Sequence, residues 1–376
     1  MSTAEKTGNA IDRKLLHDLF DVPEDEGPSR LVLAARREHY TLPYLVLSVL
    51  ETEGVELGGT AAGELARARR RAAHYDDLVD RVLAGTDLEV LKGRGLAARY
   101  PSGVLRAQGD LDLVIRDEAQ LWRAATALTA NPVLSASVTL FGAPKRDLVV
   151  TLCWVPEEPL VDPEVRVELL TAPLFGDHAA VPVRRDLPDD PALADLLCVA
   201  EEGLQRPYHR RDALDLYVLV GAASLDRADV LDAAAASNLA PELAALVEYT
   251  ADQLPVSEAS EWLPLLRPEA ERETKRRADH PAPEPTTTTA EALAAGGVLH
   301  GMPLGGAATH TGNEVLLHGY GDEVLALTPI GDYLLVSGAI VSRDLFDTAL
   351  AERDTLHPGA YRNTLGGKGD EPGRDD

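Results

Sequence analysis

The spacing of apolar residues changes along the chain and predicts both helices and strands. From residue 29 to 84 apolar side chains recur every three or four positions, the period of a helix with one buried face. From residue 88 to 170 they form short runs separated by turn residues, which is typical of strands. The helical spacing returns from residue 191 to 249. We therefore predict an α/β (α+β) fold in which helices flank a mixed sheet, followed by a helical subdomain and a small C-terminal β-rich module.

The elements expected from these patterns share clear boundary residues, mainly Gly, Pro and capping Asp or Thr. The expected strands are 88–91, 110–115, 135–141, 148–154 and 165–170. The third and fourth of these runs, 135–141 and 148–154, are joined by a short turn and predict a hairpin. The expected helices are 29–50 with a break at Pro43, 60–84, 96–100, 118–129, 191–222 divided at Pro207, 227–237 and 241–249.

Composition shifts divide the chain into six predicted segments. A polar N-terminal stretch is expected to be loose apart from a turn near Leu15, and a charged, Pro/Thr-rich stretch is expected to be a linker. Beyond the linker, Gly-rich apolar sequence predicts short strands and one helix. The segments are 1–28 (loose), 29–180 (α/β domain), 181–266 (helical subdomain), 267–291 (linker), 292–357 (β-rich module) and 358–376 (disordered tail).

Charge and cysteine content restrict the location and the partners. The 376 residues carry a formal net charge of −26, which repels nucleic acid and anionic membranes. The two cysteines, Cys153 and Cys198, sit in apolar surroundings, where a core position in a reducing compartment is expected. No signal sequence or membrane-length apolar run is present. These features predict a cytoplasmic protein that binds neither membrane nor nucleic acid.

The most informative stretch is Leu91 to Ile115, LKGRGLAARYPSGVLRAQGDLDLVI. Asp110 and Asp112 come directly before an apolar run, and in a strand two residues at this spacing point to the same face, about 6–7 Å apart. Two carboxylates held so close repel each other unless a cation lies between them. Magnesium binds one or two carboxylates together with phosphate oxygens, and two Mg²⁺ ions fit such a pair when phosphate is present. The pair therefore predicts a metal site.

This stretch resembles an uncharacterised nucleotidyltransferase family within the DNA polymerase β-type nucleotidyltransferase superfamily. The matching residues are Leu91-Lys92-Gly93, Leu96, Tyr100-Pro101, Arg106 and Gly109-Asp110-Leu111-Asp112-Leu113-Val114. The resemblance implies a nucleotidyltransferase-type sheet and transfer of a nucleoside monophosphate from an NTP such as ATP, with Mg²⁺. It implies that Asp110 and Asp112 bind metal and act in catalysis, that Gly93 and Gly109 shape the turns, and that Lys92 and Arg106 contact phosphate. The likeness is weaker over residues 60–219 and does not cover residues 267–376.

Two departures from the family pattern bear on catalysis. The superfamily usually has Gly-Ser or Gly-Gly nearer the Asp pair, where this chain has Lys92-Gly93 farther upstream. It also needs a third carboxylate on a later strand, and the corresponding position here is Thr151, which cannot be an anionic ligand. Glu168 and Asp147 are the available substitutes. We prefer Glu168, because it alternates with apolar residues and therefore faces away from their side of the strand.

Three functional hypotheses follow. The first is a magnesium-dependent nucleotidyltransferase acting on a small molecule or a protein. The second is a catalytically reduced scaffold on the same fold, with Thr151 as its main support. The third, a toxin-type enzyme that modifies RNA, is disfavoured by the negative charge. The basic run from Arg67 to Arg71 is interpreted as a solvated helix face, with phosphate contact as the alternative, and the spacing of His300, His310 and His318 fits no standard metal site.

Overall fold

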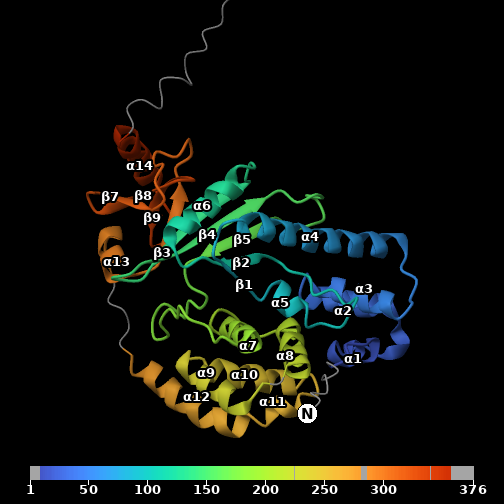
Figure 1. The fold of residues 1–376 in the computed structure, drawn as a ribbon. Helices are drawn as coiled ribbons and strands as arrows, with labels where there is room; N and C mark the ends of the chain where they lie inside the picture. The colour runs from blue at the N-terminus through green and yellow to red at the C-terminus, as the bar shows by residue number, and fades with distance from the viewer. Residues whose placement is uncertain (1–8, 224, 281–285, 339, 357–376) are drawn as a thin grey trace, which may run out of the picture. The chain divides into compact units, whose positions relative to one another are not determined.

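The computed structural model describes residues 9–223, 225–280, 286–338 and 340–356, and its fold is mixed α/β, as predicted (Figure 1). The chain forms two compact units. The first comprises residues 1–135 and 147–285, and the second comprises residues 136–146 and 286–376. The boundary runs through the predicted hairpin, so β4 (Asp147–Trp154) belongs to the first unit and β3 (Ser135–Phe141) lies in the second unit after its first residue.

The first unit is built on strands in the order β1-β2-β5-β4, with β1 at Glu89–Leu91, β2 at Leu111–Val114 and β5 at Val165–Leu170. Strands β2 and β5 are parallel, and the other two neighbouring pairs are antiparallel. Leu113, Val167 and Leu169 are fully buried because alternate positions in a strand share one face. Helix α6 (Glu118–Thr129) packs on β4 and β5.

The other face of this sheet changes character along the strands. At one end Val114 and Leu170 pack with Leu197 and Cys198 of α7 (Pro191–Glu201). Toward the other end of the same face lie Asp112, which is two positions before Val114, and Glu168, two positions before Leu170. The helix therefore covers the apolar end of this face, and the carboxylates lie beyond it.

The remaining helices of the first unit form its largest apolar core, which draws on both ends of the unit. Leu16, Leu31, Leu50, Leu216 and Leu246 belong to this one cluster and are almost completely buried. The predicted helical subdomain therefore shares a core with the N-terminal helices and is not separate from them. The helices are α1 (Arg13–Leu19), α2 (Pro28–Glu38), α3 (Leu42–Thr52), α4 (Gly59–Leu83), α5 (Arg94–Ala97), α8 (Arg210–Ala222), α9 (Arg227–Ala236), α10 (Ala240–Ala251), α11 (Ser257–Ser260) and α12 (Leu263–Ala278), with short 3-10 turns at Glu24–Glu26 and Glu202–Leu204.

Residues 1–28 were predicted to be loose apart from a turn near Leu15, and at this turn the structure has helix α1, from Arg13 to Leu19. Helix α1 begins after Asp12, whose carboxylate caps the helix by accepting from the Leu15 amide at 2.8 Å. Leu16 and Leu19 of this helix are fully buried in the main core. Burial of these two leucines fixes the helix to the main core.

The predicted linker at 267–291 was also wrong over its first part, because α12 continues through it to Ala278. Leu266 is fully buried against the main core, and the buried Glu273 forms an ion pair with Arg277. Arg277 also donates to both carboxylate oxygens of Glu242 on α10, each at 2.7 Å. The ion pair between Arg277 and Glu242, which are distant in sequence, helps to stabilise α12, a helix that the local composition did not predict. Residues 281–285 of the predicted linker lie outside the described residues.

The second unit is the expected β-rich module, with β3 added to it. Its strands follow the order β3-β6-β9-β8-β7, and all neighbours are antiparallel. Leu325, Leu334 and Ala349 form the centre of its core. The elements are β6 (Leu299–Pro303), β7 (Leu316–Tyr320), β8 (Glu323–Thr328), β9 (Gly331–Val336), α13 (Thr289–Ala295) and α14 (Arg343–Leu356). The predicted tail at 358–376 lies outside the described residues.

The sequence predicted no membrane-spanning segment, and the length and hydropathy of the helices are the observations that bear on this prediction. Within residues 9–356, apart from the gaps given above, no helix is long and apolar enough to cross a bilayer.

Candidate active site

The sheet of the first unit places Asp112 and Glu168 side by side. The two residues are directly paired across the parallel strands β2 and β5, and Thr151 on β4 is paired with Glu168. Directly paired residues project to the same face. Asp110 immediately precedes β2, two positions from Asp112, and is exposed. The structure thus brings together the two predicted metal ligands and the preferred third acid.

Asp147, the alternative third acid, lies in a different place. It is four positions from Thr151 along β4, a separation of roughly 13 Å for a strand. Its carboxylate is buried, forms an ion pair with Arg185 and accepts from the Thr171 hydroxyl at 3.2 Å. Asp147 is therefore part of a structural ion pair, and Glu168 is the acid adjacent to Asp112.

Electrostatic repulsion within the acidic group is strong. The pKa of Asp112 is raised to about 8 by burial, together with the carboxylates of Asp110, Glu168 and Glu202, against the opposing effect of Lys92. Glu202 follows α7 and was not among the predicted site residues. Because the local sequence gives no sign of its position, only the docking of α7 on the sheet brings it to Asp112. This acidic group, made up of Asp110, Asp112, Glu168 and Glu202, therefore has more carboxylates than Lys92 can neutralise.

The oxygen donors suit magnesium in kind, because Mg²⁺ binds one or two carboxylates and takes its other ligands from phosphate and water. The neighbouring carboxylates that, after burial, raise the pKa of Asp112 are the observation that fits a cation here. Across the described part of the chain, however, no three His, Cys, Asp or Glu side chains are grouped closely enough to hold a metal ion by themselves. Asp110 and Asp112 are thus the residues that would hold metal, with phosphate completing the set.

Glu168 already has partners. Arg166, two residues earlier on β5, forms an ion pair with its carboxylate, and the Thr151 hydroxyl donates to the same oxygen at 3.4 Å. Arg166 is exposed, so this pair is weak by the usual measure of surface ion pairs. Thr151, where the resemblance led us to expect an acid, instead supports the neighbouring glutamate.

Lys92 adopts an unusual backbone conformation at the end of β1. Its φ is +48°, a left-handed value that is uncommon for a residue with a side chain. Its ammonium group forms an ion pair with Glu202, and Asp112 also acts on it electrostatically. Lys92 therefore lies beside the acidic group, as predicted, but its charge is shared with a carboxylate of the protein.

Arg106 is buried and fully engaged, which differs from the phosphate contact that we expected. Its Nε and Nη2 donate to the two oxygens of Asp215 on α8 at 2.6 and 2.8 Å, and its Nη1 donates to the Lys92 carbonyl at 2.7 Å. Tyr100 donates its hydroxyl to Asp215 at 2.6 Å. Arg106 therefore holds the Lys92 turn against α8.

The two predicted glycines are required by close packing. A Cβ at Gly109 would lie 1.9 Å from the Tyr40 hydroxyl oxygen. The Gly109 carbonyl accepts from the Tyr75 hydroxyl at 3.0 Å and from Arg71 at 3.1 Å. Gly109 thus lets three side chains fix the backbone directly before Asp110.

Gly93→Ala should lower the free energy of unfolding by about 1–3 kcal/mol. Its added Cβ would lie 2.6 Å from Val90 Cγ1 and 3.0 Å from Gln108 Nε2. Gly95→Ala is the matched control, since nothing lies within 4 Å of its Cβ and alanine is the better helix former. Urea denaturation of both variants checks the prediction, and equal stability of the two would contradict it.

Two cavities meet at the acidic group. The larger, of about 280 Å³, extends past Asp110, Asp112 and Glu168 to an apolar wall of Pro173, Leu174 and Phe175. The smaller, of about 80 Å³, extends toward α8. Both are lined by Leu91, Lys92, Asp110, Asp112 and Glu202.

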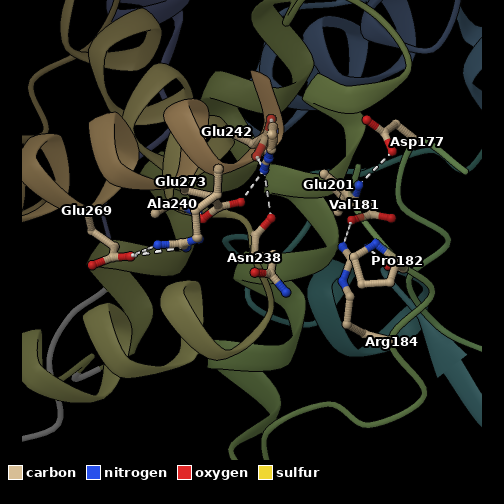
Figure 2. Close-up of polar contacts among 12 residues, drawn as sticks. Asp177, Val181, Pro182, Arg184, Glu201, Asn238, Ala240, Glu242, Glu269 and Glu273 are labelled. Atoms are coloured by element: carbon tan, nitrogen blue, oxygen red, sulfur yellow. Dashed lines mark hydrogen bonds and ion pairs between the residues drawn. The ribbon is translucent and has the colours of Figure 1, made fainter. Parts of the chain in front are cut away.

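The apolar wall of the larger cavity is fixed by a buried ion pair. Arg184 pairs with Glu201 at the end of α7 (Figure 2). Glu201 also accepts from the Gly176 amide at 2.7 Å. Gly176 has a φ of +69°, and a Cβ there would lie 2.0 Å from the Val181 carbonyl oxygen. The loop after β5 is therefore held rigidly beside the carboxylates.

The smaller cavity contains two arginines that we did not predict. Arg206 donates to both oxygens of Asp212, at 2.7 and 3.0 Å, and pairs with Glu202 at 3.1 Å. Arg211, in the first turn of α8, is half-buried and lines the same cavity. Nothing in the local sequence indicates that the segment before α8, with Arg206, and the first turn of α8, with Arg211, come to the site.

The basic run on α4 does not contribute free cations. Arg67, Arg69 and Arg70 form ion pairs with Asp162, Glu51 and Glu157, respectively. Arg71 donates to the backbone carbonyls of Pro163, Glu164 and Gly109. Arg69 and Arg70 are exposed, as expected of a solvated helix face, and acidic residues and carbonyls from other segments already use the charges of the run.

Two histidines of the second unit make ordinary contacts. His318 bonds to Glu352 at 2.8 Å, and His300 bonds to the Thr139 hydroxyl at 3.3 Å.

Comparison with known proteins returned no match: no family model, curated protein or solved structure is significantly similar to this chain. The family resemblance of residues 91–115 therefore stays a prediction.

Proposed function

We propose that the chain is a magnesium-dependent nucleotidyltransferase that moves a nucleoside monophosphate from an NTP to a small molecule or a protein. The observation that carries this proposal is the position of Asp110 and Asp112 at the start of β2. They lie beside Glu168 and Lys92, at the junction of two cavities. Asp112 carries a repulsion that a divalent cation with bound phosphate would relieve.

The proposed reaction is an in-line displacement at the α-phosphorus. The acceptor oxygen forms a bond to this phosphorus, the bond between phosphorus and the β-phosphate oxygen breaks, and pyrophosphate leaves. Magnesium, when bound, would supply electrostatic stabilisation of the attacking and leaving oxygens. Asp110 and Asp112 would hold it, Lys92 would lie beside the phosphates, and Glu168 would accept the proton from the acceptor oxygen. For Glu168 to act as a base, Arg166 must leave its carboxylate, which the exposure of that ion pair permits.

The acceptor and the location are proposed on charge and cysteine chemistry. With a net charge of −26, the protein repels a nucleic-acid acceptor, which favours a small molecule or a protein. Both cysteines are free, which is consistent with the reducing conditions of the cytoplasm.

The experiment that tests the proposal measures pyrophosphate release from each NTP with Mg²⁺ and candidate acceptors, beside NTP binding by calorimetry. We expect binding of at least one NTP that depends on Mg²⁺, and pyrophosphate release with a suitable acceptor. Failure of every NTP to bind would sink the proposal. Chelation of Mg²⁺ by EDTA is the control and should remove both signals.

The second candidate is a nucleotide-binding scaffold without turnover on the same fold. It is favoured by Thr151 in the position where an acid was expected and by the engagement of Glu168 with Arg166. NTP binding without pyrophosphate release, across a broad set of acceptors, would favour the scaffold over the enzyme.

A further inference from the structure

Arg211 differs from every other cation in the smaller cavity. Within the described ranges its guanidinium makes no hydrogen bond and no ion pair, although the side chain is half-buried. In the same cavity Lys92 pairs with Glu202, Arg106 with Asp215, and Arg206 with Asp212. Arg211 is thus a preformed donor with its capacity unused.

The charge of Arg211 reaches the acidic group. Burial acts to raise the pKa of Glu202. The charge of Lys92, the hydrogen bond from Lys92 to Glu202, and the charges of Arg206 and Arg211 outweigh burial and lower the pKa. Arg211 likewise acts on Tyr40, whose hydroxyl lies over Gly109 next to Asp110. The guanidinium therefore lies within electrostatic reach of both sides of the site.

We propose that Arg211 binds the β- and γ-phosphates of the NTP, which leave together as pyrophosphate. This inference rests on the proposed function and names the residue that recognises its leaving group. A guanidinium offers donors in a planar fork that matches phosphate oxygens. Asp110 and Asp112 would hold the metal, and the phosphates would also need a cation that the protein does not already neutralise.

The composition of the cavity supports an Mg²⁺–polyphosphate rather than a bare anion. Four cations and five carboxylates line it, so an anion without its metal would meet net repulsion. The cations are Lys92, Arg106, Arg206 and Arg211, and the carboxylates are Asp110, Asp112, Glu202, Asp212 and Asp215.

The test compares the binding of ATP, AMP and inorganic tripolyphosphate, each with Mg²⁺, to the full chain and its variants by calorimetry. Arg211→Gln should weaken ATP and tripolyphosphate about tenfold or more, the usual scale for loss of a charge-assisted contact. AMP affinity should change by less than about twofold, because AMP lacks the two outer phosphates. Arg211→Lys should recover part of the affinity for tripolyphosphate.

Arg210→Gln is the matched control, because the neighbouring Arg210 binds the Leu19 carbonyl at 2.6 Å and pairs with Asp21 and Glu38 outside the cavity. It should leave tripolyphosphate binding unchanged. Wild-type affinity that survives in Arg211→Gln overturns this inference while the proposed function stands. An equal loss for AMP and ATP in that variant also overturns it, since it indicates a structural role. No binding of ATP or tripolyphosphate by the wild-type chain overturns both.

Discussion

Asp112→Asn should reduce Mg²⁺-dependent pyrophosphate release by about 1,000-fold or more, because loss of a metal ligand removes several kcal/mol of stabilisation of the transition state. Asp112 has the larger expected effect of the two metal ligands, since it is directly paired with Glu168, whereas Asp110 precedes the strand and is exposed. Asp110→Asn should cause a loss of the same order. The measurement is the initial rate with saturating NTP and acceptor.

The stability of the same variant separates a lost ligand from a damaged fold. Because the folded-state pKa of Asp112 is raised to about 8, its carboxyl is ionised in the unfolded chain but still protonated in the folded chain between about pH 4 and pH 8. The protein therefore loses stability as the pH rises across this range. The Asn variant has no such loss. In metal-free buffer we therefore expect its free energy of unfolding to equal or exceed that of the wild type, with a difference that grows up to pH 8.

The control for this experiment is Asp87→Asn, which changes an exposed carboxylate in the loop before β1. Its activity and stability should match those of the wild type. Retention of more than a tenth of the wild-type rate by Asp112→Asn would contradict a role in metal binding. A marked fall in its stability would instead indicate that the carboxylate is structural.

Asp215→Ala should destabilise the first unit by about 3–5 kcal/mol, because it leaves the guanidinium of Arg106 buried without its counter-charge. Arg106 also holds the Lys92 carbonyl, and Lys92 has a strained positive φ. We therefore expect the variant to lose activity as well as stability. Urea denaturation gives the free energy, and NTP binding reports on the turn.

A double-mutant cycle tests the pairing itself. Arg106→Met combined with Asp215→Leu replaces both charges with apolar side chains and should recover most of the lost stability. The Lys92 carbonyl would still lack its donor, so NTP binding should stay weak. Tyr100→Phe removes one hydrogen bond to Asp215 and should cost about 1 kcal/mol. Additive effects of the two charge substitutions would refute the pair as a coupled unit.

Several local features of the site could be read directly from the sequence. The run LKG followed by YP and GDLDLV predicted a strand, a turn, a short helix and a second strand, and these are observed as β1, α5 and β2. The spacing of Asp110 and Asp112 predicted their common face. Alternation along β5 predicted that Glu168 lies opposite the buried Val167, which is confirmed. Each of these properties depends on the period of one strand.

Predictions that depended on composition were less successful. Polar residues suggested an N-terminus that is loose apart from one turn and a linker after residue 266, yet Leu16, Leu19 and Leu266 anchor these segments in the core. A few large apolar side chains outweigh many polar neighbours, because complete burial of one leucine contributes about 1.5–3 kcal/mol. A composition average does not reveal which leucine is buried.

The sequence by itself determined the α/β class, the acid pair on one strand and the glycine turns, because these follow from local periodicity and backbone sterics. Only the tertiary structure decided which groups join that pair. Parallel pairing of β2 with β5 selected Glu168 over Asp147, and the docking of α7 and α8 added Glu202 and Arg211. The position of α8 also pairs Arg106 with Asp215. Charges distant in sequence find partners through packing, and the pattern of a single element carries no information about that choice.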